Sequence, residues 1–236
     1  MILYSSKYRS QQQEIMDDAE LSGDSLATLL NDLKKVNTLL GGFSITLDGV
    51  ETLVLNSPKT TSLTLLDLGC GDGESLRKCA QFMRKQQRTM KFIGVDMNEH
   101  ILEIAKEKSN DYPEISYLKL NILEKNQQLP NFDIATCNLF LHHFSEPQII
   151  ELLNKLIKQG KRGVVINDLR RSKLAFQLFK IFGLLFMKSK IAKHDGLVSI
   201  ARAFKRKELK KMAEKLNGEH IIKGRWAFRY QWLIKF

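Results

Sequence analysis

The hydrophobic positions divide the chain into a helical first quarter and a longer part in which short apolar runs alternate with amphipathic stretches. In the first quarter, apolar side chains recur at helical spacing, at Leu26, Leu29, Leu30, Leu33, Val36, Leu39 and Leu40. Asp24 can cap this helix, and Gly41 with Gly42 can end it. A second short helix is expected over residues 46–55. Residues 1–60 are therefore predicted to form an N-terminal helical extension.

From residue 61 onwards, apolar runs of strand length are separated by helical stretches. Strands are predicted at 64–68, 91–95, 115–120, 132–137 and 163–167, and helices at 74–88, 99–108 and 147–159. The last helix has clear boundary signals: Ser145 and Gln148 form a capping-box pattern, Pro147 lies in the first turn, and Gly160 can end it. Such alternation predicts an α/β fold, with a mostly parallel sheet and helices on both of its faces.

The alternation ends after residue 167. Residues 174–187 are apolar on nearly every side, and a loop containing His194, Asp195 and Gly196 is expected to follow. Beyond a predicted helix over 207–216, two strand-like runs at 221–223 and 227–236 flank a turn. Residues from about 170 to 204 therefore stand apart from the alternating pattern as an insertion.

Positive charge is concentrated in the last third of the chain. The formal net charge is +11, but residues 1–150 carry 15 Lys and Arg against 20 Asp and Glu, whereas residues 151–236 carry 22 against 6. A basic region can attract nucleic acid, anionic lipid or an acidic partner. It can equally be an ordinary solvated surface that is rich in lysine.

The cysteines and the apolar segments bear on the compartment. Cys70, Cys79 and Cys137 lack the spacing of a structural zinc site and fit a reducing environment. The first residues lack the apolar core of a signal peptide, and no apolar run approaches the roughly 20 residues that cross a bilayer. We therefore expect a cytoplasmic protein that needs no metal.

The segment between the first predicted strand and the next helix is rich in glycine. Apolar residues 63–66 lead into Asp67-Leu68-Gly69-Cys70-Gly71-Asp72-Gly73. Glycines permit a tight turn with positive φ and let the backbone approach a ligand closely. The spacing G-x-G-x-G after an acidic residue differs from the dinucleotide fingerprint G-x-G-x-x-G. The pattern predicts a nucleotide-cofactor loop, and its alternative is an ordinary tight strand–helix turn.

An acidic residue, Asp96, ends the second predicted strand, 23 residues after Gly73. Ligands of an open α/β sheet bind outside the carboxyl ends of the strands. A carboxylate there can accept two hydrogen bonds from the hydroxyls of a ribose. Asp96 could instead cap the helix that begins near residue 99, but Asn98 is better placed for that role.

This combination resembles the first motif of the Rossmann-like, S-adenosylmethionine-dependent methyltransferases, which is an acidic residue followed by x-G-x-G-x-G. The resemblance implies a seven-stranded, mostly parallel sheet with an antiparallel C-terminal hairpin, and S-adenosylmethionine as the cofactor, with S-adenosylhomocysteine as its product. It also implies a methyltransferase domain over residues 61–236, a lid over 1–60, and an insertion at about 170–204 that covers the substrate. The implied cofactor-binding residues are Asp67, Gly69, Cys70, Gly71, Gly73, Asp96, Met97, Asn121, Ile122 and Asn138.

Several of these positions have specific implied roles. Asp67 would hold the loop or meet the methionine ammonium through water, and Met97 would form an apolar wall for the adenine. Asn121 stands where many relatives carry Asp, but its carbonyl oxygen can still accept a hydrogen bond from the adenine amino group. Cys70 would be a small neutral spacer between two glycines.

Two histidines, His142 and His143, follow the fourth predicted strand. Their segment resembles the post-strand segment of ubiquinone/menaquinone-type methyltransferases, where the methyl group and the acceptor meet. Imidazole, with an ordinary pKa near about 6.5, can take a hydroxyl proton, so both are candidate catalytic bases. Either can instead be a structural hydrogen-bonder that closes the pocket. Asp168, after the fifth strand, could orient a histidine, bind the substrate hydroxyl, or pair with Arg170 or Arg171 in a structural role.

The acceptor is expected to be a small molecule. Phe176 and Phe179 could line an aromatic pocket, or could belong to a buried core helix, and Asp195 and Arg202 are expected as polar substrate contacts. Shorter motifs resemble a bacterial branch found with type III polyketide synthases, namely Met16-Asp17-Asp18, Val36-Asn37, Leu40-Gly41-Gly42, Asn167-Asp168-Leu169-Arg170 and residues 195–204. That resemblance implies O-methylation of a phenolic or lipid-like polyketide.

Two other functions fit parts of the sequence. The basic region would suit an RNA methyltransferase, but the N/D-P-P-Y/F signature of amino-methylating enzymes is absent, so nucleic acid is not expected as a partner. The glycine loop and Asp96 argue only for binding, so a non-catalytic S-adenosylmethionine-binding protein also fits. The basic region and the insertion can make peripheral contact with an anionic membrane. A monomer and a homodimer are both compatible with the sequence.

Overall fold

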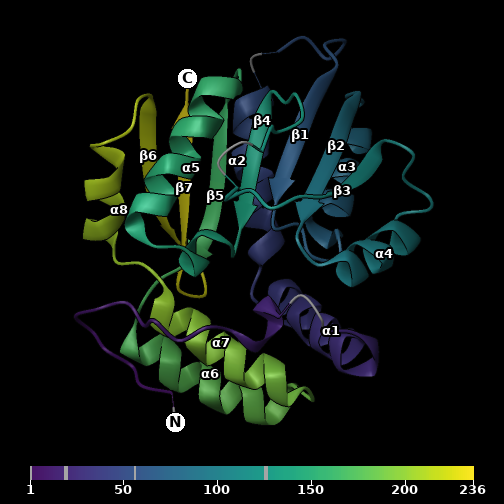
Figure 1. Cartoon of the computed structure of the whole chain (residues 1–236). Coiled ribbons are helices and arrows are strands. Elements are labelled where there is room, and N and C mark those ends of the chain that lie inside the picture. Colours follow the sequence, from purple (N-terminus) through teal and green to yellow (C-terminus); the bar gives the residue numbers. More distant parts are fainter. Residues whose placement is uncertain (1, 19–20, 56, 125–126) are drawn as a thin grey trace.

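The computed structural model describes residues 2–18, 21–55, 57–124 and 127–236. Its centre is a seven-stranded sheet in the order β3-β2-β1-β4-β5-β7-β6 (Figure 1). The strands are β1 (Leu63–Leu68), β2 (Met90–Asp96), β3 (Ile115–Lys119), β4 (Ile134–Asn138), β5 (Gly163–Leu169), β6 (Glu219–Arg225) and β7 (Arg229–Lys235). Strands β1 to β5 pair in parallel, and β7 pairs antiparallel with both β5 and β6. The predicted Rossmann-like sheet with an antiparallel C-terminal hairpin is therefore confirmed.

Two layers of helices cover the two faces of this sheet. One face packs against α2 (Gly42–Val54), α3 (Glu74–Lys85) and α4 (Glu99–Lys108), and the other against α5 (Glu146–Gln159) and α8 (Arg206–Ala213). Successive side chains of a strand point to opposite faces, so Leu65 packs with α2 and α3 whereas Leu66 packs with α5. Each fully buried leucine contributes about 1.5–3 kcal/mol, which makes this alternation the main source of cohesion between the layers.

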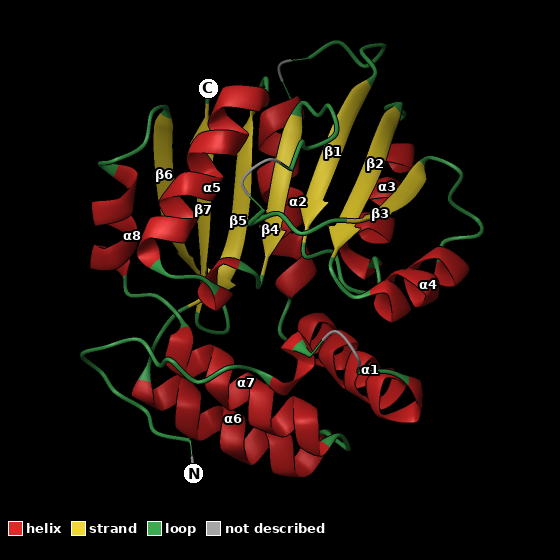
Figure 2. Ribbon diagram, viewed as in Figure 1, coloured by secondary structure: helices red, strands yellow, loops and turns green. Residues whose placement is uncertain are grey.

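A further layer of helices lies at the carboxyl ends of the parallel strands (Figures 1 and 2). It consists of α1 (Gly23–Leu39), α6 (Lys173–Phe186), α7 (Lys190–Arg202) and the segment 2–18 with the 3-10 helix η1 (Ile15–Asp17), and we call it the cover. Apolar side chains of α1 pack with Ala192 of α7, and α6 packs with α7 and with Ile2 and Tyr4. The cover therefore meets the sheet at the edge where an open α/β sheet binds its ligands.

The two helices of the predicted N-terminal extension belong to different layers. Helix α1 is part of the cover, while α2 packs on the sheet beside α3 and against β5 and β7. Gly41, with φ of 65°, separates them, and α2 begins at Gly42 rather than near residue 46. The expected cap at Asp24 is wrong, because Ser22 occupies the N-cap position and Asp24 lies in the first turn.

The loop predicted around Asp195 is also wrong, because these residues lie inside α7. The buried face of this helix carries Asp195, Ser199 and Arg202 at helical spacing. Their polar atoms bond to the N-terminal segment and to the 3-10 helix η2 (Leu141–His143). A buried face that is polar produces no apolar periodicity, and the sequence pattern therefore does not reveal the helix.

Helix α5 begins and ends at the residues that the sequence indicates. The N–H and Oγ of Ser145 donate to Gln148 Oε1 at 2.9 Å and 2.7 Å, Pro147 lies in the first turn, and Gly160 follows the last residue. In the part of the chain that the structure describes, no helix combines the length and the apolar character needed to cross a bilayer.

Candidate functional site

The glycine loop joins β1 to α3 at the carboxyl edge of the sheet. Gly69, Gly71 and Gly73 all have positive φ, at 65°, 54° and 75°. A Cβ atom on Gly69 would overlap the Phe140 ring, whereas a Cβ atom on Gly71 would point into open space. The loop is thus closed by packing on one side and accessible to a ligand on the other.

Asp96 ends β2 directly beside the glycine loop. Its Oδ2 accepts a hydrogen bond from the Gly71 N–H at 3.0 Å, and its Oδ1 accepts one from the Asn98 N–H at 3.1 Å. Burial raises the pKa of Asp96 above its ordinary value, although these backbone donors oppose the shift. Asn98 caps α4 by accepting from the Ile101 N–H at 3.1 Å, as predicted. Because each carboxylate oxygen has a further lone pair, Asp96 can still accept hydrogen bonds from a ribose.

Asp67 is buried in β1 and connects the glycine loop to β4. Its Oδ1 accepts hydrogen bonds from Thr136 Oγ1 at 2.6 Å and from Asn138 Nδ2 at 2.9 Å. Burial raises the pKa of Asp67 to about 7, against the effect of these two donors. Asn138 Oδ1 in turn accepts from Thr46 of α2. Asp67 therefore fixes the side-chain amide of Asn138 at the carboxyl edge of the sheet.

The other predicted cofactor residues lie at strand ends and within the loop. Met97 is half exposed directly after β2, and Ile122 is buried after β3. Asn121 is exposed, and its Oδ1 accepts a backbone N–H two residues further on at 3.1 Å. Cys70 is buried in the loop, and burial raises the pKa of its thiol well above the ordinary value. A neutral thiol of this kind agrees with the expected role as a spacer.

A cavity connects the glycine loop with the cover. Asp67, Gly69, Gly71 and Asn138 line it on the side of the sheet, and His143 lines it on the side of the cover. Its apolar wall is formed by Met16, Leu30, Leu33, Phe43, Leu139 and Leu169. A ligand seated on the glycine loop would thus lie in the same space as the histidine pair.

His142 is almost completely buried between two carboxylates, Asp168 and Glu14. Its Nδ1 lies 2.8 Å from Asp168 Oδ1, and its Nε2 lies 3.2 Å from Glu14 Oε1. Burial alone would lower the pKa of His142, but the two carboxylates outweigh it and raise the pKa to about 9. His142 is therefore an imidazolium at neutral pH, suited to balance charge rather than to accept a proton. Asp168 orients this ring, as one alternative predicts, while Arg171 pairs with Glu208 at 2.5 Å.

His143 is less buried and lines the cavity. Its Nδ1 lies 3.0 Å from Asp17 Oδ1, and its Nε2 lies 3.9 Å from Glu14 Oε2. Burial would raise the pKa of Asp17, but its contacts with His143 hold that pKa below the ordinary value. The carboxylate of Asp17 therefore orients the His143 ring through Nδ1.

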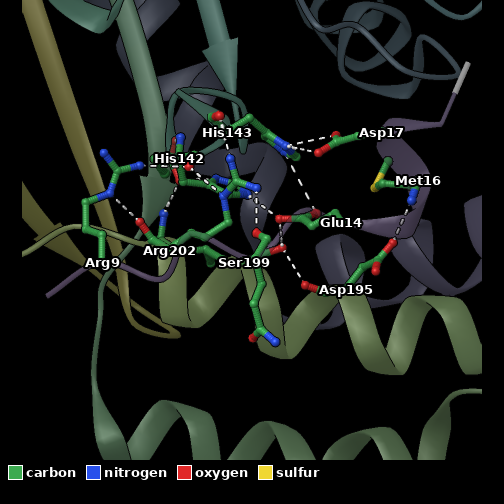
Figure 3. Close-up of polar contacts among 12 residues, drawn as sticks. Arg9, Glu14, Met16, Asp17, His142, His143, Asp195, Ser199 and Arg202 are labelled. Carbon is green, nitrogen blue, oxygen red and sulfur yellow. Dashed lines mark hydrogen bonds and ion pairs between the residues drawn. The ribbon is translucent and has the colours of Figure 1, made fainter. Parts of the chain in front are cut away.

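The N-terminal segment supplies site residues that sequence reasoning missed (Figure 3). Glu14 accepts from Ser199 Oγ at 2.8 Å, and Arg9 donates to the carbonyls of Arg202 at 2.6 Å and His142 at 2.7 Å. The partners of this segment lie 126 to 193 positions further along the chain, and no local pattern reports such contacts. The triplet Met16-Asp17-Asp18 is the signal in the sequence that pointed to this segment.

Asp195 and Arg202 lie on the buried face of α7, where they engage backbone groups. The two carboxylate oxygens of Asp195 accept from the N–H groups of Ile15 and of the next residue, both at 2.9 Å. Arg202 donates to the Gln12 carbonyl at 2.8 Å and to the carbonyls of both histidines at 3.1 Å and 2.5 Å. These two side chains therefore fasten α7 and the N-terminal segment to η2.

Phe176 and Phe179 lie between the helices of the cover. The Phe176 ring is buried, with its centroid 5.2 Å from that of Tyr4. Phe179 packs so closely on Gly196 of α7 that a Cβ atom at this glycine would overlap its ring. Neither is among the residues that line the cavity. Both rings lie on the packed side of α6, but the outer side of this helix is exposed, so α6 is not the buried core helix of the alternative.

Glu14, His142 and His143 also form a group of the type that can hold a divalent metal. One ligand atom from each lies within 4.8 Å of the others. Metal binding requires a neutral imidazole nitrogen. Glu14 lies 3.2 Å from His142 Nε2 and 3.9 Å from His143 Nε2, so the same three side chains also form an ion-pair network.

Known proteins resemble this chain over much of its length. The family described as "Methyltransferase domain" matches residues 59–221. An uncharacterized protein of Rickettsia prowazekii (strain Madrid E) is 31% identical over 108 residues, which are 44% of this chain and 42% of that protein. The 2-phytyl-1,4-naphtoquinone methyltransferase of Thermosynechococcus vestitus is 27% identical over 137 residues, which are 58% of this chain and 60% of that protein. The matches thus span about half the length of these curated relatives.

A solved structure shares the fold. The plantazolicin methyltransferase BpumL, in complex with SAH, superposes with a TM-score of 0.62 over 89% of this chain and 93% of that chain, at 17% identity. The match to the family covers well over half of the chain, from the residues before β1 into β6. The chain therefore belongs to the methyltransferase domain family, in the Rossmann-like class that depends on S-adenosylmethionine.

Proposed function

We propose that the protein transfers the methyl group of S-adenosylmethionine to an oxygen atom of a small phenolic or lipid-like acceptor. The observation that carries this proposal is the shared cavity, which the glycine loop lines on one side and Glu14 and His143 line on the other. The sheet side would hold the cofactor, and the cover would hold the acceptor and take its proton.

The residues around the glycine loop suit this cofactor. The open space beside Gly71 would admit the nucleoside, Asp96 would accept from the ribose hydroxyls, and the exposed Met97 would flank the adenine. Asp67 and Asn138 line the cavity where the methionine part would lie. The bound cofactor supplies an activated methyl sulfonium, so the protein mainly has to align it with the nucleophile, which can contribute about 7–11 kcal/mol.

His143 is the proposed proton acceptor. Asp17 holds its Nδ1 at 3.0 Å, which orients the ring and stabilises the imidazolium that forms. The acceptor hydroxyl would give its proton to Nε2 while its oxygen bonds to the methyl carbon. The carbon–sulfur bond breaks and sulfur keeps the electron pair.

The cavity wall favours an acceptor with an apolar body. Met16, Leu30, Leu33 and Phe43 line the cavity, and all four come from the cover or from α2. Apolar walls with a few polar groups are typical of sites for small organic ligands. The name of the Thermosynechococcus relative, a naphtoquinone methyltransferase, agrees with an aromatic acceptor of quinone type. The segment 2–18 with α1, α6 and α7 would act as the lid over this acceptor.

Transfer from methyl-labelled S-adenosylmethionine to alkylated phenols and quinols tests this function. We expect label in the organic phase as a methoxy group, identified by mass spectrometry. His143→Gln should lower the rate by about 100-fold or more, while His100→Gln, on the exposed surface of α4, should not change it. Label on RNA or protein would contradict the acceptor class. Cofactor binding without transfer to any acceptor would favour a non-catalytic binding protein.

The outer face of α6 supports a second element of this proposal, contact with an anionic membrane from the cytoplasm. Leu174, Leu178, Ile181 and Leu185 are three or four residues apart, and each is between 47% and 70% exposed. Residues 169–194 carry seven Lys and Arg and no acidic residue. Such a face can enter the headgroup region while its lysines meet anionic lipids. A lipid-like acceptor could then reach the cover from the membrane.

Sedimentation with vesicles tests this contact. We expect binding to phosphatidylglycerol vesicles that weakens with salt, and little binding to phosphatidylcholine. The double change Leu178→Ser and Ile181→Ser should abolish binding, whereas Leu55→Ser, an exposed leucine after α2, should not. A dimer that the double change dissociates, without any vesicle binding, would instead assign this face to a second copy of the chain.

A further inference from the structure

A buried guanidinium in the cavity wall is only partly hydrogen-bonded among the described residues. Arg229, the first residue of β7, is 2% exposed and lines the cavity. Its Nη2 donates to Asn37 Oδ1 at 2.8 Å, but its Nε and Nη1 have no hydrogen-bond partner among the described residues. Burial lowers the pKa of Arg229 to about 10, so the group is still charged at neutral pH. Buried charged donors without acceptors are strongly unfavourable, which indicates that something else satisfies them.

The surroundings of Arg229 add positive potential. A Cβ atom on Gly42 would lie 3.1 Å from both Cζ and Nη1 of Arg229, so the guanidinium rests against the first turn of α2. The N-terminus of this 13-residue helix has no side-chain cap, and a helix N-terminus carries a partial positive charge. The Asp168 carboxylate, which acts on Arg229 through space, is already bonded to His142. An anion in the cavity would balance both charges.

An unpaired acceptor lies on the same side of the sheet. Asn167 Nδ2 donates to the Gly42 carbonyl at 2.8 Å and to Thr46 Oγ1 at 3.1 Å, while its Oδ1, also buried, has no hydrogen-bond partner among the described residues. Asn167 and Leu169 are two positions apart on β5 and therefore share one face, and Leu169 is directly opposite Arg229 on β7. Asn167 and Arg229 therefore point to one face, and both line the cavity beside Gly42.

We propose that Arg229, Asn167 and the first turn of α2 form a binding site for a carboxylate that has an N–H or O–H donor next to it. The carboxylate would take the free donors of Arg229, and the neighbouring donor would bond Asn167 Oδ1. Two ligand types have this chemistry: the amino-acid end of the cofactor, and an acceptor that is a hydroxy acid. The site rests on the proposed function in that both are ligands of this cavity.

Calorimetric titration distinguishes the two ligand types. S-adenosylhomocysteine carries the carboxylate and the ammonium, whereas 5′-methylthioadenosine lacks both. If the site holds the cofactor, Arg229→Met weakens S-adenosylhomocysteine binding by about 10- to 100-fold and leaves 5′-methylthioadenosine unchanged. Arg225→Met, on the same hairpin but paired with Asp48, should change neither.

If the site holds the acceptor, both nucleosides bind Arg229→Met normally. In that case wild-type protein loaded with S-adenosylhomocysteine should prefer 2-hydroxybenzoate over 2-hydroxybenzyl alcohol, and Arg229→Met should lose the preference. Equal affinities of wild type and Arg229→Met for all four compounds would overturn the proposal. A wild type that shows the Arg229-dependent binding but never transfers a methyl group would contradict the proposed function and leave the site intact.

Thermal unfolding without ligand distinguishes a binding role of Arg229 from a structural role, because the two roles predict opposite changes in the midpoint temperature. Arg229→Met removes an unpaired buried charge, so the midpoint temperature of the ligand-free protein should stay the same or rise. With ligand present, the variant should lose the stabilisation that the wild type gains. A clear fall in the ligand-free midpoint with undiminished ligand binding would make Arg229 a structural residue and overturn the proposal.

Discussion

The sheet core is held together by apolar burial, whereas the cover combines two smaller apolar clusters with directional polar contacts. In the core, side chains such as Leu65 and Leu66 bury apolar surface on alternate faces of one strand. In the cover, α7 is fixed by Asp195 and Arg202, which bond backbone groups of the N-terminal segment and of η2. Apolar burial is non-directional and cooperative, whereas each hydrogen bond or ion pair of the cover requires its own distance and angle. We therefore expect the proposed cofactor site on the core to stay rigid while the cover opens locally.

The largest expected effect belongs to the core. Trp232 in β7 is fully buried in the layer beneath α5 and α8. Trp232→Ala should lower the free energy of unfolding by about 3–5 kcal/mol and abolish cofactor binding and methyl transfer together. Urea denaturation measures the loss when it is monitored by far-ultraviolet circular dichroism, a backbone signal that does not depend on the removed tryptophan. A variant that binds S-adenosylhomocysteine normally would show that the core is not the cooperative unit described.

The next effect concerns pH and the buried imidazolium of His142 in η2, which the cover contacts. The folded pKa of His142 is raised to about 9, above the unfolded value. Its stabilising contribution is therefore fully present below pH of about 6.5 and is lost as pH rises through 9. Glu14 and Asp168, whose pKa values are lowered, stay ionised across this window.

Thermal unfolding between pH 6 and 9.5 measures this dependence. The midpoint of the wild type should fall by several degrees across the window. His142→Gln should flatten that part of the profile, while His100→Gln keeps it. A wild-type midpoint that does not vary over this range would contradict the ion-pair network.

Releasing the cover should lower the free energy of unfolding by less than the core substitution does, and should leave cofactor binding intact. Asp195→Ala removes the acceptor of two backbone N–H groups and should lower stability by about 1–3 kcal/mol. Hydrogen exchange should speed up at Ile15 and Met16, while S-adenosylhomocysteine affinity stays close to wild type. Asp24→Ala, exposed in the first turn of α1, is the matched control. If amide protection from hydrogen exchange fell equally throughout the sheet, the core and the cover would unfold as one unit and the distinction between them would be wrong.

The smallest change in stability is expected for a substitution in the glycine loop, which tests whether the open side of the loop is ligand space. Gly71→Ala introduces a Cβ atom that meets no protein atom within 4 Å, at a φ of 54°. We expect a cost of about 1–2 kcal/mol in folding but a loss of at least about tenfold in S-adenosylhomocysteine affinity, since the methyl occupies ligand space. Undiminished affinity in calorimetry would place the cofactor elsewhere.

The core could be predicted from the sequence because its physics is local. Alternation of apolar residues marks strands such as β1, and capping residues mark helices such as α5, where Ser145 and Gln148 behave as expected. The glycine loop with Asp96 follows from the same strand boundaries, because parallel strands end at one edge of the sheet.

The cover could not be predicted in the same way. Asp195 lies on the buried face of α7, so hydrophobic periodicity gives no indication of that helix. Glu14 lies in a polar segment whose partner His142 is 128 positions away, and only the folded chain brings them together. For the same reason the pattern placed Phe176 at an acceptor, whereas in the structure its ring packs with Tyr4.

The division of tasks between core and cover is tested most directly by two measurements on one variant, Glu14→Gln. Glu14 contacts both histidines and lies on the cover side of the cavity. The account predicts an S-adenosylhomocysteine dissociation constant within about threefold of wild type and a methyl-transfer rate at least about 100-fold lower. Glu151→Gln, exposed on α5, should leave both unchanged. Parallel loss of binding and transfer, or full transfer by the variant, would contradict it.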